Sequence, residues 1–180
     1  IAGRTILQWQ LDALLQAGVS EINVITGFHS EQVETHIQSS FPDNNEIKTI
    51  YNPFYTVSDN LASCWMARKH MEADFLLING DTIFEPRLLD VVLNSADAEV
   101  ILTVDFKDSY DEDDMKVSLE NGAVKNVSKI LNAEETSAES IGILYFRGAG
   151  ARQFISNLES AMRGPDGLNS WFLSVVDKMA

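Results

Sequence analysis

The apolar stretch Phe75-Leu76-Leu77-Ile78 constrains the fold more than any other part of the chain. Four apolar residues in a row, followed by turn-forming residues, are typical of a strand that is buried on both faces, as in a parallel sheet. The run ends at Asn79-Gly80, and the carboxylate of Asp81 follows at once. In open α/β sheets ligands bind beyond the carboxyl ends of the strands, where a carboxylate can hold a divalent cation against phosphates. The alternative for Asp81 is a capping role in the turn before Pro86.

Length and charge narrow the class of protein. The chain has 180 residues, enough for one domain with a sizeable core, and 45% of them are hydrophobic. The formal net charge of -14 argues against non-specific binding to nucleic acids or anionic membranes, although a local site with a metal can still hold a nucleotide. No apolar stretch approaches the ~20 residues of a membrane span. The single cysteine, Cys64, suits a reducing compartment, so we expect a cytoplasmic protein.

Strands and helices alternate through the first half of the chain. Apolar spacing and end signals predict helices at residues 5–17, 30–38, 59–71 and 86–93. Strands are predicted at residues 21–26, 47–51, 75–78 and 99–105. Ser30 is the expected N-cap of the second helix. This alternation is typical of a doubly wound α/β fold with a mostly parallel sheet.

The second half departs from this alternation. Asn121-Gly122, between the segments 116–119 and 123–127, predicts a β-hairpin, because Asn-Gly favours the tight turn that joins two antiparallel strands. A strand and two helices are predicted after it, at residues 141–146, 150–161 and 168–179. We therefore expect the hairpin to be an insertion on the α/β sheet.

Polar residues gather at four further places that could carry chemistry. Residues 52–55 and 58–63 pair a turn with the start of a helix, where free backbone N–H groups can meet a base or an anion, with ordinary N-capping as the alternative. Residues 105–114 are rich in carboxylates, and we favour a solvated acidic loop over a metal cluster because the spacing does not match an EF-hand. Lys129 could neutralise phosphate charge. Glu139 could accept hydrogen bonds from the hydroxyl groups of a ligand or pair with a cation.

Other familiar sites are not indicated. The histidines at positions 29, 36 and 70 are scattered, without a second ligand at the spacing of a zinc site. The Gly-x-Ser-x-Gly and Gly-x-x-x-x-Gly-Lys motifs do not occur, which argues against an α/β-hydrolase and a P-loop NTPase. Cys64 is better explained as a small apolar helix residue than as a nucleophile.

Eight short motifs follow one another along nearly the whole chain. They are Gly3-Arg4-Thr5-Ile6-Leu7 with Gln10-Leu11, Val24-Ile25-Thr26-Gly27-Phe28, Asn52-Pro53-Phe54-Tyr55, Asp59-Asn60-Leu61, Asn79-Gly80-Asp81, Asp113-Asp114-Met115-Lys116-Val117, Glu139-Ser140-Ile141-Gly142 and Trp171-Phe172-Leu173-Ser174-Val175. Their order and spacing together resemble the nucleotidyltransferase (NTP-transferase) family, above all its bacterial phosphocholine cytidylyltransferase-like branch. The resemblance implies a Rossmann-like sheet of the nucleotide-diphospho-sugar transferase type with a hairpin insertion.

The resemblance also implies roles for individual residues. Asp81 would bind Mg²⁺, and Lys129 would approach the phosphates as a second catalytic residue. The residues implied to bind the nucleotide are Asn60, Leu61, Ala62, Ser63 and Gly80. The residues implied to meet the acceptor substrate are Tyr110, Asp114, Glu139 and Trp171. If the acceptor is phosphocholine, its quaternary ammonium needs an aromatic or carboxylate surround, for which Trp65 is a further candidate.

The implied reaction, of the EC 2.7.7 type, is attack by a phosphate monoester oxygen on the α-phosphorus of a nucleoside triphosphate, with release of pyrophosphate. It needs in-line positioning and cationic compensation of charge more than covalent help. Our leading hypothesis is transfer of CMP from CTP to phosphocholine or a similar ester. The sequence does not determine whether the protein forms a homo-oligomer. The alternatives are transfer to a sugar 1-phosphate, a GT-A-type glycosyltransferase, and a non-catalytic nucleotide-binding domain. The lone carboxylate of Asn79-Gly80-Asp81 counts against the glycosyltransferase, which usually carries Asp-x-Asp.

Two features of the family have no counterpart in these residues. One is a glycine-rich loop, with an arginine and a Pro-Lys pair, which follows the first strand and holds the triphosphate. The other is a second metal-binding aspartate after the last helix. That first strand would lie between the strands at 21–26 and 75–78, and a sheet without it would leave backbone groups unpaired. We therefore expect residues 1–180 to be a single nucleotidyltransferase domain that is incomplete at both ends. The alternative is that another segment takes the place of the missing strand.

Overall fold

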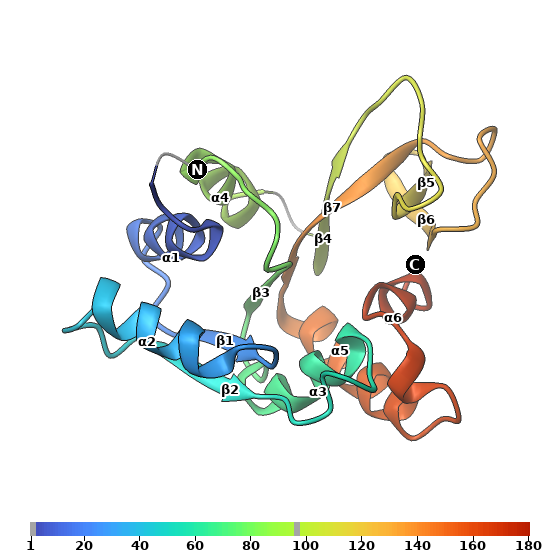
Figure 1. The fold of residues 1–180 in the computed structure, drawn as a ribbon. Helices are drawn as coiled ribbons and strands as arrows, with labels where there is room; N and C mark the ends of the chain where they lie inside the picture. The colour runs from blue at the N-terminus through green and yellow to red at the C-terminus, as the bar shows by residue number, and fades with distance from the viewer. Residues whose placement is uncertain (1–2, 96–97) are drawn as a thin grey trace.

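The computed structural model describes residues 3–95 and 98–180, and it confirms the prediction of an α/β fold (Figure 1). The helices are α1 Ile6–Gln16, α2 Ser30–Ser40, α3 Asn60–Ala67, α4 Pro86–Leu93, α5 Gly148–Met162 and α6 Leu173–Asp177. The strands are β1 Ile22–Thr26, β2 Ile47–Tyr51, β3 Phe75–Ile78, β4 Val100–Asp105, β5 Lys116–Glu120, β6 Ala123–Ser128 and β7 Ala138–Phe146. Among the described helices, none is both long and apolar enough to cross a lipid bilayer.

Parallel pairing is found in a separate two-stranded sheet. β1 and β2 pair in register from Ile22 opposite Ile47 to Thr26 opposite Tyr51. Within the described residues, β2 is the only strand that pairs with β1, and β7 is the only one that pairs with β3. Each of β1 and β3 therefore keeps one edge without a strand partner there. The expectation of a further strand between them stays a prediction.

The larger sheet is built around β7 and is antiparallel. Phe146 of β7 lies opposite Phe75 of β3 on one side and opposite Val100 of β4 on the other. The hairpin of β5 and β6 joins the first residues of β7, with Lys116 opposite Glu139. The expectation of a mostly parallel sheet is thus met by β1 and β2 only. The reason is that β7 lies between β3 and β4, which run in the same direction without touching each other.

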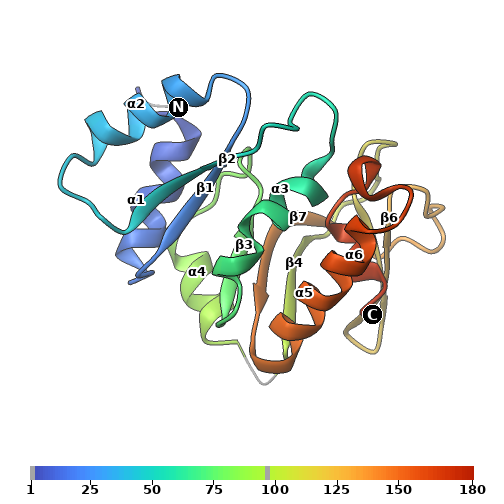
Figure 2. The same ribbon diagram turned by 90° about the horizontal axis from the view of Figure 1, so that it is seen from below.

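Two hydrophobic clusters meet at β3. Phe75 and Leu77 pack against the cluster that includes Phe146 and Phe154, under α3 and α5. Leu76 and Ile78 pack against the second cluster, which α1 and α4 supply. Figure 2 shows these two pairs of helices on opposite sides of β3. The alternation of side chains along a strand explains the apolar run, because both faces of β3 are covered.

Two helix predictions need correction. Ser30 is not the N-cap of α2, because His29 occupies that position in a left-handed conformation, with φ of 53°. The helix predicted at 168–179 is broken into a 3₁₀ turn, Gly167–Asn169, and α6. Residues 168–172 cannot bond to each other as a helix because they bond to the start of α3. The N–H groups of Asp59 and Leu61 donate to the carbonyl oxygens of residues 168 and 170, over 2.7 and 3.2 Å.

Glycine at position 142 is required by the backbone of β7. Its φ is +76°, and a Cβ atom there would collide with the side chain of Asn79 at the end of β3. Gly122, in the predicted hairpin turn, has φ of +80° but open space around it. Its neighbour Asn121 is also left-handed, with φ of 54°, as the tight hairpin turn demands.

These two glycines provide a matched test of the β3–β7 junction. Gly122→Ala should lower the free energy of unfolding by about 1 kcal/mol, because only the backbone conformation is strained. Gly142→Ala should lower it by about 3 kcal/mol, because the collision with Asn79 adds to the same strain. Urea denaturation measures both variants. Equal losses would show that the contact between Gly142 and Asn79 contributes nothing.

Candidate functional site

One open cavity of about 510 Å³ gathers residues from six segments of the chain. Its lining residues are Asn60, Asn79, Asp81, Thr82, Asp113, Asp114, Met115, Lys129, Glu139, Ser140, Ile141, Trp171, Phe172 and Leu173. Six of the residues predicted from the sequence are among them. Those six are Asn60, Asp81, Asp114, Lys129, Glu139 and Trp171.

Asp81 stands in a turn that is fixed on both sides. Gln10 of α1 donates its side-chain N–H to the carbonyl oxygens of Asn79 and Thr82, over 2.8 and 2.7 Å. The hydroxyl of Thr82 donates to the carbonyl oxygen of Ile141 on β7, over 2.8 Å. The exposed carboxylate of Asp81 has no hydrogen bond or ion pair within residues 3–95 and 98–180. The turn therefore presents a free carboxylate just beyond the carboxyl end of β3.

Gln10 is a residue whose role the sequence reasoning missed. It was noted as part of a motif, but no function was assigned to it. It is buried, unlike most glutamines, and it lies on the apolar face of α1 beside Leu11 and Leu14. A polar residue on that face was the available signal that a backbone partner had to be near.

Lys107 links two carboxylates of the cavity. Its ammonium lies 2.6 Å from Glu139 Oε1 and 3.3 Å from Asp114 Oδ2. The backbone N–H of Asp111 also donates to Asp114, over 2.9 Å, and this bond with the nearby charges holds the pKa of Asp114 below its usual value. The hydrogen bond with Glu139 raises the pKa of Lys107. Lys107 was not identified from the sequence, since it lies in a loop that is otherwise acidic.

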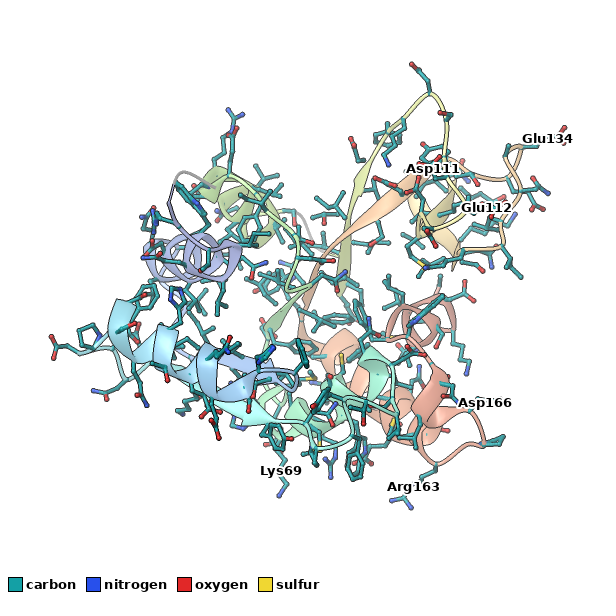
Figure 3. The ribbon with its side chains drawn as sticks, in the orientation of Figure 1. Lys69, Asp111, Glu112, Glu134, Arg163 and Asp166 are labelled. Atoms are coloured by element: carbon teal, nitrogen blue, oxygen red, sulfur yellow. The ribbon has the colours of Figure 1, made fainter. Side chains whose placement is uncertain are left out.

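The other carboxylates of the acidic loop, residues 105–114, are exposed, as expected for a solvated segment. Asp105, Asp108, Glu112 and Asp113 are exposed, and Figure 3 labels Glu112 on the outer side of the hairpin region. In the described part of the chain, no group of three or more histidine, cysteine or acidic side chains is placed to hold a metal ion. Two residues of this loop, Asp113 and Asp114, line the cavity.

Lys129 lies between Trp171 and the acidic loop. Its ammonium is 4.4 Å from the ring centroid of Trp171, at a distance suited to a cation–π interaction, and 3.8 Å from Asp113 Oδ1. The buried Lys116 donates from Nζ to the carbonyl oxygen of Lys129, over 2.9 Å, which fixes the point where the chain leaves β6. Asn60 holds the opposite wall, because its Oδ1 accepts a hydrogen bond of 2.9 Å from the N–H of Phe172.

Five predicted site residues do not line the cavity. Leu61 and Ala62 are buried in the core, because α3 turns these two positions inward, and their N–H groups donate to backbone carbonyls. The Ser63 hydroxyl accepts a hydrogen bond from Asn52 over 3.2 Å, and Gly80 lies in the turn between two lining residues. The Tyr110 hydroxyl donates to the carbonyl oxygen of residue 137, over 3.1 Å.

The remaining reactive side chains have structural positions. Burial raises the pKa of Cys64 to about 12, which argues against a role as nucleophile and confirms it as a small core residue. His70 lies 2.7 Å from Glu21, which also accepts a hydrogen bond from Asn23. Trp65 packs under the Arg68 guanidinium, 3.9 Å from its ring centroid, and does not line the cavity.

Comparison with solved structures places this arrangement among known folds. The inositol-1-phosphate CTP transferase of T. maritima superposes with a TM-score of 0.78 over 99% of this chain and 69% of its own, at 16% sequence identity. The CTP:phosphocholine cytidylyltransferase of Streptococcus pneumoniae gives a TM-score of 0.72 over 99% of this chain and 72% of its own, at 15% identity. The chain has the nucleotidyltransferase fold. The resemblance predicted from the motifs is confirmed at the level of the fold.

Sequence comparison adds one curated relative. The CMP-5'-(3-aminopropyl)phosphonate synthase of Streptomyces rubellomurinus is 30% identical over 101 residues, which make up 56% of this chain. The match spans only 16% of that protein. No protein-family model matches the chain. Within the nucleotidyltransferase fold, the cavity lies at the carboxyl end of β3, where α/β folds bind their ligands.

Asn60 should support the cavity wall through its carbonyl oxygen. Asn60→Ala should lower the free energy of unfolding by about 1 to 2 kcal/mol, because the N–H of the buried Phe172 loses its acceptor. Asn60→Asp keeps an acceptor in the same place and should stay within about 0.5 kcal/mol of the native value. Chemical denaturation compares the two variants. A similar loss in both would mean that the hydrogen bond does not stabilise the wall.

Proposed function

We propose that this chain forms part of a Mg²⁺-dependent nucleotidyltransferase that transfers CMP from CTP to a small phosphate or phosphonate acceptor. The observation that carries the proposal is the cavity at the end of β3, where Asp81, Lys129 and Glu139 come together in a fold shared with cytidylyltransferases. In the reaction, an oxygen of the acceptor forms a bond to the α-phosphorus, the bond to the bridging oxygen breaks, and pyrophosphate leaves.

Asp81 suits the role of a magnesium ligand. Mg²⁺ is commonly held by one or two carboxylates together with substrate phosphates and water, and does not need a cage of protein ligands. The free, exposed carboxylate of Asp81 in a pinned turn fits this pattern. The metal would offset charge on the triphosphate and on the leaving pyrophosphate. Asp81 would hold it, while Gln10 and Thr82 keep the turn in place.

Lys129 suits the role of the cation that meets the phosphates. Its interactions in the free protein, with the Trp171 ring and with the exposed Asp113, are both of the weak kind that a phosphate can replace. The backbone of Lys129 is fixed by Lys116, so only its side chain has to move. A single mobile ammonium on a fixed backbone can follow the charge as it develops in the transition state.

Charge in the cavity supports an acceptor that carries an ammonium group. Lys129 lies near Asp113, Asp81 would be taken by the metal, and Lys107 balances only one of the two carboxylates of Asp114 and Glu139. One negative charge is left over at that side of the cavity. The names of two similar proteins contain compounds with such a group, phosphocholine and a (3-aminopropyl)phosphonate. An inositol phosphate, named for the T. maritima protein, carries no such group.

The test is magnesium-dependent release of pyrophosphate by the full-length protein that contains this chain. CTP, UTP, dTTP and GTP would each be offered with phosphocholine, 3-aminopropylphosphonate and glucose 1-phosphate. We expect release with CTP and the cationic acceptors. Release with a sugar phosphate alone would keep the reaction class and overturn the acceptor, and no release from any pair would contradict the proposed function.

Asp81→Asn should reduce the rate of pyrophosphate release at saturating Mg²⁺ by roughly 100-fold or more, because the variant loses the charge that holds the metal. Asp108→Asn is the matched control, since Asp108 is exposed and does not line the cavity. It should leave the rate unchanged. Equal rates in the two variants would show that Asp81 does not hold the metal.

Lys129→Met should lower kcat/KM by roughly 100-fold while leaving the free energy of unfolding within about 1 kcal/mol. The reason is that Lys129 contributes little to the free structure, where its carboxylate partner is fully exposed. Lys69→Met is the control, because Lys69 is exposed and points away from the molecule at its lower side in Figure 3. A large loss of stability in Lys129→Met would assign the residue a structural role instead.

A further inference from the structure

Lys107 touches two residues of the cavity without lining it. Its side chain comes from the loop after β4, and its ammonium bridges Glu139 of β7 and Asp114 of the loop before β5. The side chains of these two carboxylates are only 15% and 17% exposed, whereas that of Lys107 is 36% exposed. The lysine thus reaches the pair from the solvent side, behind the wall that faces a ligand.

Lys107 is the cation that forms ion pairs with Glu139 and Asp114 in the described part of the chain. Across the sheet from Glu139 lie Asp105 of β4, which is exposed, and Lys116 of β5. Lys116 has no carboxylate within 4.0 Å in the described part of the chain and directs its ammonium to a backbone carbonyl. Four other charged or titratable residues lie at this wall. Asp113 and Lys129 lie near each other, 3.8 Å apart. The N–H of Asp111 donates to Asp114, and the Tyr110 hydroxyl accepts a hydrogen bond from the N–H of Lys107.

We infer that Lys107 is a specificity-determining positioning residue, which fixes Glu139 and Asp114 and sets one net negative charge at the acceptor side of the cavity. This inference rests on the proposed function and names its acceptor class: a phosphate or phosphonate with one cationic group. Two carboxylates and one ammonium leave a single negative charge, which matches a single ammonium on the acceptor. Without Lys107 the two carboxylates would face the acceptor with two charges, or one of them would take up a proton.

The preference between an acceptor with an ammonium group and an acceptor without one reports this charge. It is measured as kcat/KM for phosphocholine divided by kcat/KM for glucose 1-phosphate, with both acceptors in competition. Lys107→Met should raise this ratio about 10-fold at pH 8, because a second uncompensated carboxylate attracts the ammonium and repels an acceptor that has only negative charge. Lys107→Arg keeps the cation and should leave the ratio within about twofold of the native value.

A second substitution separates charge from mere packing. Glu139→Gln in the Lys107→Met background removes the extra carboxylate charge, so the ratio should return toward the native value. Lys125→Met is the control, because Lys125 pairs with the exposed Glu120 and lies outside the cavity. An unchanged ratio in Lys107→Met, a similar change in Lys125→Met, or no return in the double variant would overturn the inference.

The pH dependence gives a further readout that packing alone would not move. In Lys107→Met the neighbouring carboxylates repel each other, so the pKa of one of them should rise. As the pH falls from 8 to 6, that group takes up a proton, and the excess ratio should decline. The ratio of Lys107→Met is divided by the native ratio at the same pH, which removes the titration of the acceptor phosphates. In the native protein, the N–H of Asp111 and the ammonium of Lys107 hold the pKa of Asp114 below its usual value, so the decline is expected in Lys107→Met relative to the native protein.

Failure of the proposed function can be told apart from failure of this inference. Carbon-13 NMR of the side-chain carboxyl groups follows the titration of Glu139 and Asp114 in the absence of any substrate. A raised titration midpoint in Lys107→Met, in a protein that releases no pyrophosphate, would reject the proposed function and retain the charge-setting role of Lys107. Midpoints unchanged from the native protein would overturn that role, whatever the activity.

Discussion

The packing of β3 on both of its faces is the constraint on which the rest of the structure depends. Phe75 and Leu77 enter one hydrophobic cluster and Leu76 and Ile78 the other, so a strand of four residues joins both halves of the core. Because each face packs against its own cluster, a shift of register by one residue would exchange the side chains between the two clusters. The turn that follows it is consequently fixed in space, and Gln10 and Thr82 bond it to α1 and β7.

The opposite wall of the cavity depends on backbone bonds between distant segments. The carbonyl oxygens of residues 168 and 170 and the N–H of residue 172 bond to Asp59, Leu61 and Asn60 at the start of α3. This bonding satisfies N–H groups that every helix leaves free at its first turn. It also places Trp171 beside the ammonium of Lys129. A helix N-terminus that looked available to a ligand is therefore largely used for assembly, with Asn60 left at the surface of the cavity.

The sequence predicted what local patterns determine, and missed what distant contacts determine. The bounds of α4, the two-residue turn at Asn121-Gly122 and the strand β3 follow from turn chemistry and periodicity, and all are found, with the side chains of β3 partly buried. The break before α6 was missed, because apolar spacing cannot show that a segment's N–H and carbonyl groups will bond elsewhere. Antiparallel pairing of β7 with β3, β4 and β5 was missed for the same reason. Among site residues, Asp81 could be found from its position after a strand, whereas Lys107 could not, because only the fold brings it to Glu139 and Asp114.

The distribution of charge explains how a chain with a net charge of -14 could still offer a site to polyanions. Repulsion of phosphate depends on the charges near the cavity, since the field of distant surface carboxylates is screened within about 8 to 10 Å at physiological ionic strength. Near the cavity, Asp113 lies close to Lys129, and Asp114 and Glu139 share Lys107, so most of the local charge is already balanced. The free carboxylate of Asp81 is left for a metal, which would reverse the sign of the field at that point. The proposed binding of a triphosphate would therefore depend on these few nearby ion pairs and on a metal cation.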